Sequence, residues 1–281
     1  MVDGPVPVVR RALSGVLAAS LLGLFVLPVV ALFVYAGGGG IVAAARDAGF
    51  RISIEFTLLA SGLAVGLGLL TGVPLGYLLA RHRFPGRTVV ESVVLMPVAI
   101  PHLVVGIALL LLFAPSAPLG RLTAALGIPI FDSIAGVVLV MVYVGASYVV
   151  LTSELAFRSA SPGALDAARS LGASPTEAFV TVTLPSAARG IVTGALLMWA
   201  RGISEVGGFL ILAYAVTPSP PWGGPVTSTA SVYVYNLYGI EGLPGATSAA
   251  ALLVLVALAI FVTVRLLDRT GFAWARGGWF S

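Results

Sequence analysis

The side chains best suited to chemistry are an arginine and a glutamate inside an apolar stretch, Arg201 and Glu205. They are four residues apart, so on a helix they share one face. Charged residues inside a membrane span each cost about 2.5 to 3.5 kcal/mol on insertion scales, and they face a bundle interior, a cavity or each other. One hypothesis is that Arg201 helps an anion cross, while Glu205 holds the guanidinium and keeps it from trapping the ion. The alternative is an internal ion pair that only fixes helix packing.

Other reactive groups are scarce in this chain. It has no cysteine and no lysine, and its two histidines, His82 and His102, are far apart with no carboxylate cluster at ligand spacing. A metal site, a P-loop and a Schiff-base cofactor are therefore not expected. The motifs HExxH and GxSxG are also missing, so the chain is not expected to be an enzyme. We interpret His82 as part of a basic cytoplasmic turn and His102, after Pro101, as a packed or cavity residue.

The composition is typical of a membrane protein. Of the 281 residues, 59% are hydrophobic and 9% are charged, whereas a soluble domain has about 25% charged residues. The net charge of +4 comes from arginines that lie beside apolar spans. This placement is typical of the arginine-rich cytoplasmic loops of a membrane protein rather than of a nucleic-acid-binding surface. The sequence predicts an all-α, polytopic membrane protein.

Six segments are long and apolar enough to cross a bilayer core of about 30 Å. They lie near residues 12–35, 57–80, 89–113, 134–157, 187–213 and 248–267. The glycine run at 37–40 is expected to end the first helix as a turn. Proline or glycine interrupts three spans, at 72–76, 97–101 and 202–208. These places are either breaks that face protein or a cavity, or ordinary helix kinks.

Arginine placement predicts the orientation. Eleven arginines fall on one side of the spans: Arg10, Arg11, Arg81, Arg83, Arg87, Arg158, Arg169, Arg189, Arg265, Arg269 and Arg276. Three fall on the other side, Arg46, Arg51 and Arg121, and the connection 214–247 has none. The positive-inside rule then places both termini in the cytoplasm.

The cytoplasmic connection between the fourth and fifth spans is expected to form two short helices. Ser161 is a suitable N-cap before Pro162, and Gly172 is suited to a left-handed helix end. Ser174-Pro175-Thr176-Glu177 has capping-box spacing, and Pro185 is expected to stop the second helix.

The first of these helices carries a narrow apolar stripe. The stripe consists of Ala164, Leu165, Ala168 and Leu171. It suits a groove on a partner protein, and the alternative is a helix lying on lipid headgroups. Small side chains and the lack of large aromatic ones favour the protein partner.

This connection resembles the EAA loop of binding-protein-dependent ABC permeases. That pattern is Glu-Ala-Ala, three residues, Gly, nine residues, a β-branched residue, one more, then Leu-Pro. Here it is present as Asp166-Ala167-Ala168, Gly172, Val182 and Leu184-Pro185, with aspartate for glutamate and valine for isoleucine. The resemblance implies a coupling helix that sits in a cleft of an ATPase subunit.

The resemblance extends from about Leu58 to Arg265 and indicates a substrate class. Two stretches, TGVPLGYLLARHRFPGR and ESVVLMPVAIPHLVVGIALLLLF, are similar to core helices of molybdate, tungstate and sulfate permeases. Ser204-Glu205-Val206-Gly207 looks more like the tungstate branch than the Gly-Glu-Phe-Gly of molybdate and sulfate permeases. This implies tungstate or molybdate ahead of sulfate. Apart from the resemblance, Arg201, Ser204 and Glu205 are the candidate pathway residues.

The family resemblance also implies an architecture. It is a type I ABC importer permease fold in one domain, 1–281, with a first helix at 12–35, core helices at 57–267 and the coupling loop at 160–185. The expected assembly is a homodimer in the cell membrane with two ATPase subunits, which bind ATP and magnesium, and an external oxyanion-binding protein. An ion-driven secondary transporter is the rival, but it would show inverted repeats and more midmembrane carboxylates than Glu205. A membrane enzyme is a third possibility, which the missing motifs disfavour.

Overall fold

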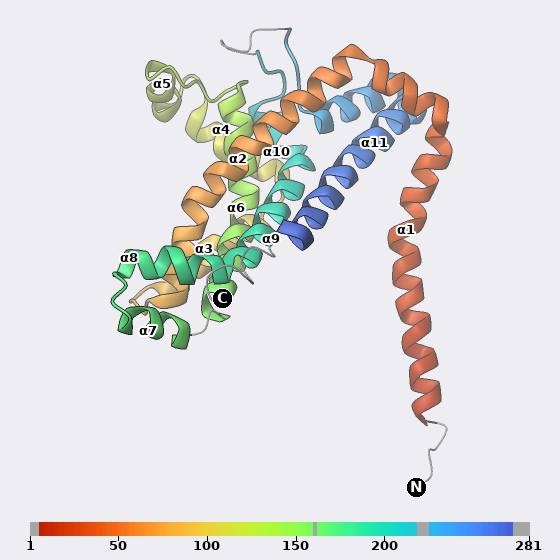
Figure 1. Cartoon of the computed structure of the whole chain (residues 1–281). Helices are drawn as coiled ribbons and strands as arrows, with labels where there is room; N and C mark the ends of the chain where they lie inside the picture. Colours follow the sequence, from red (N-terminus) through yellow and green to blue (C-terminus); the bar gives the residue numbers. More distant parts are fainter. Residues whose placement is uncertain (1–5, 160–161, 218–224, 272–281) are drawn as a thin grey trace. The chain divides into compact units, whose positions relative to one another are not determined.

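The computed structural model describes residues 6–159, 162–217 and 225–271. Within these residues the chain is almost entirely helical, and its only paired strand-like residues are one antiparallel bridge between Val216 and Thr227. The helices in chain order (Figure 1) are α1 (Val6–Arg46), α2 (Ala48–Arg81), α3 (Arg87–Ala99), α4 (His102–Phe113), α5 (Pro118–Ala125), α6 (Ile134–Ser159), α7 (Pro162–Ser170), α8 (Pro175–Ala178), the π-helical turn η1 (Phe179–Thr183), α9 (Leu184–Ile203), α10 (Gly207–Leu212) and α11 (Ala230–Gly271).

Five described helices are long and apolar enough to cross a membrane, and a sixth span is possible if a bent pair is counted as one. The five lie at Leu13–Arg46, Ala48–Arg81, Ile134–Ser159, Pro175–Ile203 and Ala230–Val264. The pair is α3 and α4, which bend by 114° at Ile100 and Pro101. Each predicted span thus has a helical counterpart, although the third and the fifth are broken and the sixth begins well before residue 248.

The described chain forms two compact units. The first contains the described residues up to Ala48 together with Val234–Leu255 of α11. Gly37, with φ +61°, bends α1, and Gly242, with φ +70°, bends α11. The prediction that the glycine run ends the first helix is confirmed at Gly37, whose non-helical φ separates two helices within α1. The rest of the run is not a turn, because the second helix includes it and continues to Arg46. The predicted connection 214–247 is also partly helical, since α11 begins at Ala230.

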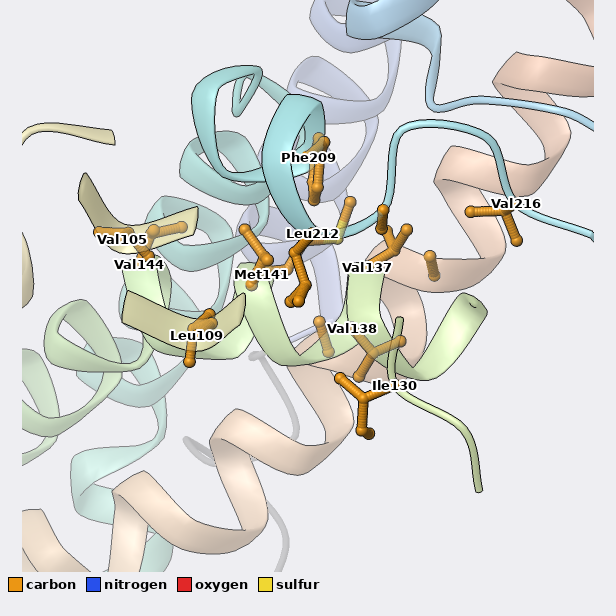
Figure 2. Packing of buried hydrophobic residues seen from close by; sticks show 14 of the residues in the cluster. Val105, Leu109, Ile130, Val137, Val138, Met141, Val144, Phe209, Leu212 and Val216 are labelled. Carbon is orange, nitrogen blue, oxygen red and sulfur yellow. The ribbon is translucent and has the colours of Figure 1, made fainter. Parts of the chain in front are cut away.

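The second unit, Gly49–Tyr233 and the residues from Val256 onward, contains the apolar core. Side chains of α6, including Val137, Met141 and Val144, pack with Phe209 and Leu212 of α10 (Figure 2). Lipid is as apolar as these side chains, so close packing rather than exclusion from water holds such helices together.

Two of the three expected interruptions are true breaks. The chain breaks at Ile100–Pro101 between α3 and α4, and at Ser204–Val206 between α9 and α10. At 72–76, where the alternatives were a break or an ordinary kink, α2 is unbroken and continues to Arg81. A Cβ atom on Gly76 would lie 2.8 Å from the carbonyl oxygen of Val150. The glycines of α2 therefore permit a close approach to α6 instead of breaking the helix.

Glycine also permits the close contact between α6 and α9. A Cβ atom on Gly194 would lie 2.1 Å from Thr152 Oγ1 and 3.0 Å from the Cα atom of Val149. The second of these neighbours is backbone and cannot rotate away.

We expect Gly194→Ala to destabilise the protein because the added methyl group forces α9 away from α6. Overpacking costs about 1 to 3 kcal/mol, which corresponds to a fall of roughly 2 to 10 °C in melting temperature. The control is Gly66→Ala on α2, where a Cβ atom would meet nothing within 4 Å. The melting temperatures of both detergent-purified variants are measured by intrinsic fluorescence during heating. Equal melting temperatures would contradict the close packing of α9 against α6.

Candidate functional site

The two helix breaks bring three polar side chains together. Arg201 lies in the last turn of α9, and Glu205 lies in the break that follows it. His102 is the first residue of α4, directly after the Pro101 break. The structure therefore joins the predicted pair with a histidine from another helix. We call Arg201, Glu205 and His102 the charged cluster.

The distances in the charged cluster are short. Arg201 Nη1 lies 2.9 Å from Glu205 Oε2, and His102 Nδ1 lies 3.0 Å from the same oxygen. Arg201 Nη2 lies 2.7 Å from His102 Nε2. The contacts to Glu205 Oε2 are ion-pair distances, whereas Arg201 Nη2 and the His102 ring form a hydrogen bond. A guanidinium can only donate, so this hydrogen bond requires an unprotonated ring nitrogen and thus a neutral imidazole. In this form the cluster has one positive and one negative charge.

Backbone contacts hold Glu205 in place. Its side chain is 0% exposed, and its Oε1 accepts the backbone N–H of Gly208 at 2.8 Å. Its own carbonyl oxygen accepts the hydroxyl of Ser231, from the first turn of α11, at 2.6 Å. A buried carboxylate needs such partners, because an unpaired charge in a low-dielectric interior is strongly unfavourable.

Close packing of α4 against α10 also depends on glycine. A Cβ atom on Gly207 would lie 2.9 Å from His102 Cβ. A Cβ atom on Gly106 would lie 2.8 Å from Ile211 Cβ. These contacts bring the start of α4 beside the break that contains Glu205.

The charged cluster is open on one side. The side chain of Arg201 is 18% exposed and that of His102 is 51% exposed. The 13 residues of α3 span about 20 Å, so His102 lies about that far from Arg87 along an apolar helix pair. Polar side chains inside apolar spans face water or protein rather than lipid. The exposed side of the cluster is therefore suited to a water-filled path or to a second protein chain.

Ser204 lies in the same break as Glu205. Its hydroxyl donates to the carbonyl oxygen of Arg201 at 3.0 Å and its side chain is exposed. It thus stands beside the charged cluster without an ion-pair role.

The sequence alone did not reveal the role of His102. Its separation from Arg201 along the chain hides the contact, and only the Pro101 break that precedes it hinted at an unusual position. His82 is not part of this cluster, and its ring packs edge-on against Tyr77 at 6.5 Å. Among the residues that the structure describes, no group of three His, Cys, Asp or Glu side chains is placed to hold a metal ion.

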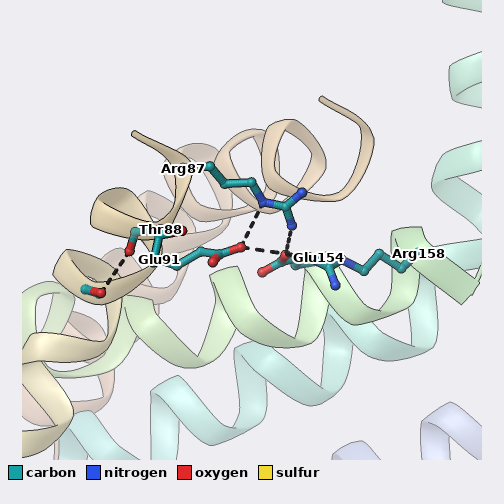
Figure 3. A network of polar contacts seen from close by, with 6 residues as sticks. Arg87, Thr88, Glu91, Glu154 and Arg158 are labelled. Carbon is teal, nitrogen blue, oxygen red and sulfur yellow. Dashed lines mark hydrogen bonds and ion pairs between the residues drawn. The ribbon is translucent and has the colours of Figure 1, made fainter. Parts of the chain in front are cut away.

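A second group of charges joins α3 to α6 (Figure 3). Arg87 Nε lies 2.8 Å from Glu91 Oε1, and Arg87 Nη2 lies 3.1 Å from Glu154 Oε1. Arg158 Nη2 lies 2.5 Å from Glu154 Oε1 and 3.8 Å from Glu91 Oε1. Each arginine thus contacts both glutamates, and this four-charge group ties the first turns of α3 to the last turns of α6.

The connection after α6 forms helices, as expected. Asp166 and Ala167 are exposed on α7, and Ala168 is half-buried. Gly172 has φ +93°, which confirms the left-handed helix end. Ser174 and Glu177 form the predicted capping box, while the expected cap Ser161 lies outside the described residues.

The prediction for Pro185 is wrong. Helical structure continues from α8 through η1 into α9, and Leu184 and Pro185 lie in the first turn of α9. A π-helical turn shifts the hydrogen-bond register just before the proline. The missing N–H and the ring of Pro185 are accommodated there, so the helix does not end.

The predicted apolar stripe of α7 is only partly covered by this chain. Leu171, which directly follows α7, is 86% exposed. Ala164 is exposed as well, and Leu165 and Ala168 are half-buried. The stripe therefore remains available to a partner surface or to lipid headgroups.

Comparison with known proteins identifies the family. The family model described as "Binding-protein-dependent transport system inner membrane component" matches residues 72–270. The chain belongs to this family, which confirms the resemblance seen in the sequence, and it is a multi-pass membrane protein of a transport system.

Several curated relatives are similar over most of their length. The "Molybdate/tungstate transport system permease protein WtpB" of Pyrococcus furiosus is 37% identical over 219 residues, 78% of each chain. A probable molybdenum ABC transporter permease protein of Haloferax volcanii is 33% identical over 261 residues, 93% of this chain and 91% of the relative. The sulfate transport system permease protein CysW of Synechocystis is 29% identical over 255 residues, 89% of this chain and 90% of the relative.

Solved structures confirm the fold. A chain of a bacterial alginate ABC transporter, in complex with an alginate pentasaccharide-bound periplasmic protein, superposes with a TM-score of 0.70 at 19% identity, covering 94% of this chain and 95% of that chain. A chain of the MetNI methionine ABC transporter gives 0.56 at 20% identity, covering 80% and 95%. The predicted all-α type I ABC importer permease fold is therefore confirmed.

We expect Arg201→Gln and Glu205→Gln to destabilise the protein singly and to compensate each other in the double variant. Removing one partner of a buried ion pair costs roughly 3 to 5 kcal/mol. We expect the lower end of this range, because Arg201 is 18% exposed. Melting temperatures of the purified variants form a double-mutant cycle. A double variant no more stable than the weaker single variant would show that the two charges do not compensate each other.

Proposed function

We propose that this chain is the transmembrane permease subunit of an ATP-driven ABC importer that moves tungstate or molybdate into the cell by alternating access. The observation that carries the proposal is the charged cluster, which opens on one side at two helix breaks inside the spans. The similarity to molybdate/tungstate permeases, at 37% identity over 78% of the chain, supports the choice of substrate.

The charged cluster suits an anion that must bind weakly and leave again. A bare arginine in a low-dielectric path would hold a dianion too strongly for transport. Glu205, 2.9 Å from the guanidinium, offsets most of that attraction. In the proposed path, Arg201 contacts the oxyanion, Glu205 moderates the attraction, and the exposed hydroxyl of Ser204 lies alongside.

The segment around α7 is the proposed docking element for a separate ATPase. The docking residues are Asp166, Ala167, Ala168, Gly172, Leu184 and Pro185. The exposed Leu171 supports this role, because burying a leucine side chain in a partner stabilises a complex by about 1.5 to 3 kcal/mol. The chain has no lysine for a P-loop. ATP and magnesium would accordingly bind to the partner.

The proposed assembly contains two copies of this chain, two ATPase subunits and an external oxyanion-binding protein, with both termini in the cytoplasm. One structural relative, a bacterial alginate ABC transporter, was solved in complex with its periplasmic protein, which supports an external partner. ATP would close the ATPase pair and draw the α7 segments together, which opens the permease outward. Hydrolysis would reset it to face inward.

Sulfate is the second candidate substrate. It is supported by the 29% identity to the sulfate permease CysW. Tungstate, molybdate and sulfate are similar tetrahedral dianions, so selectivity is expected to lie in the external binding protein. Binding measurements on that protein with each oxyanion separate the candidates.

We expect Arg201→Gln to reduce tungstate uptake at least tenfold, equivalent to about 1.4 kcal/mol. The loss follows from removing the cation that the anion meets in the path. Uptake is measured in cells that lack their own transporter and express the whole complex, with the amount of assembled permease checked. Arg121→Gln, on the short helix α5, is the control. Normal uptake by a stable, assembled Arg201→Gln complex would show that Arg201 and Glu205 contribute to helix packing only.

We expect Leu171→Glu to abolish uptake while the permease itself folds normally. Leu171 is exposed, so the substitution removes no contact within the chain, but it would place a charge in the proposed ATPase groove. Leu126→Glu, at an exposed leucine after α5, is the matched control. Co-purification of the ATPase and tungstate uptake are the two measurements. Persistence of both in the Leu171→Glu variant would contradict docking at α7, and uptake that depends only on an ion gradient would favour a secondary transporter.

A further inference from the structure

His102 lies against the guanidinium nitrogen of Arg201 that Glu205 does not hold. Arg201 Nη1 is engaged by Glu205, while Nη2 lies 2.7 Å from His102 Nε2 and 3.3 Å from His102 Nδ1. One guanidinium nitrogen is thus close to both ring nitrogens. The imidazole is 51% exposed and the arginine 18%, so the ring forms the outer layer of the charged cluster.

The covered cluster offers little attraction to an oxyanion. With a neutral imidazole, the charges of Arg201 and Glu205 cancel, and the terminal nitrogens of the guanidinium are both in contact with protein atoms. If His102 moves away, Nη2 regains the N–H group that the ring occupies, and this group can then bind an oxyanion. The position of one imidazole ring therefore decides whether Arg201 is available.

His102 directly follows one helix break, and Arg201 lies just before the other. His102 begins α4 after the 114° bend, whereas Arg201 ends α9 before the break at Ser204–Val206. The helices α4 and α10 pack through Gly106 and Gly207 and are expected to move together. A small shift of this pair at the two breaks would separate His102 from Arg201 without unfolding a helix.

We propose that His102 is a removable cover of the anion site. It occupies Arg201 while no ion is present, and it leaves Arg201 when the oxyanion binds. This inference rests on the proposed function, because it assumes that the permeating ion meets Arg201. His102 is a positioning residue in this scheme, since it acts by controlling access to the arginine.

The test is the rate at which phenylglyoxal modifies Arg201 in the purified complex, measured site by site with mass spectrometry. We expect slow modification in the native protein and modification about tenfold faster in His102→Ala. A tenfold change corresponds to about 1.4 kcal/mol for the lost contact between His102 and Arg201. His102→Gln should restore slow modification, because its amide oxygen can accept a hydrogen bond from Nη2. Leu103→Ala is the matched control, since it truncates the next exposed side chain on α4.

Equal modification rates in the native protein and in His102→Ala would overturn the proposal, as would an equal rise in Leu103→Ala. His102→Ser replaces His102→Ala in the test if the alanine variant does not fold, and the same rates are expected. Tungstate added to the uncovered variant tests the proposed function separately. If Arg201 becomes reactive but tungstate does not slow its modification, His102 is a cover and the permeation role of Arg201 fails.

Discussion

The buried carboxylate of Glu205 is the constraint on which the arrangement of the central helices depends. A fully buried negative charge must be matched, and the carboxylate is matched from three directions, by Arg201, by His102 and by the N–H of Gly208. The backbone carbonyl oxygen of the same residue accepts the hydroxyl of Ser231. The partners of this one residue thus come from α9, α4, α10 and α11, and both helix breaks lie beside it.

Breaks inside a membrane span are tolerated only where protein or water satisfies the freed backbone groups. Here the breaks produce two short helices, α4 and α10, that pack on each other through glycine, and they leave a polar cluster open on one side. The helix breaks interrupt the apolar spans, and they also bring the charged cluster together. This arrangement suits a transporter, because a passing ion needs a polar surface that is not fixed in one state.

Hydrophobic runs and helix-cap chemistry are local, and they were predictable. The span positions, the capping box at Ser174 and the left-handed Gly172 followed from residues close together in the sequence. The family also followed from the loop that begins at Asp166. Contacts between distant residues were not predictable: nothing local links His102 to Arg201, or Arg87 to Glu154. The structural effect of a glycine was also not predictable from the sequence. Gly37 breaks α1, whereas Gly76 lets α2 approach α6 closely.

The π-helical turn at Phe179–Thr183 has a consequence for how motion passes along α9. A π turn contains one residue more than the α-helical turn it replaces, and each residue of a helix turns the chain by about 100°. This extra residue sets the rotation, about the helix axis, of the α9 face that carries Arg201 relative to the α7 segment. Relaxing the turn to α-helix would twist its two ends against each other. In the proposed docking scheme, a partner bound at α7 would therefore turn α9 about its axis as well as displace it along that axis.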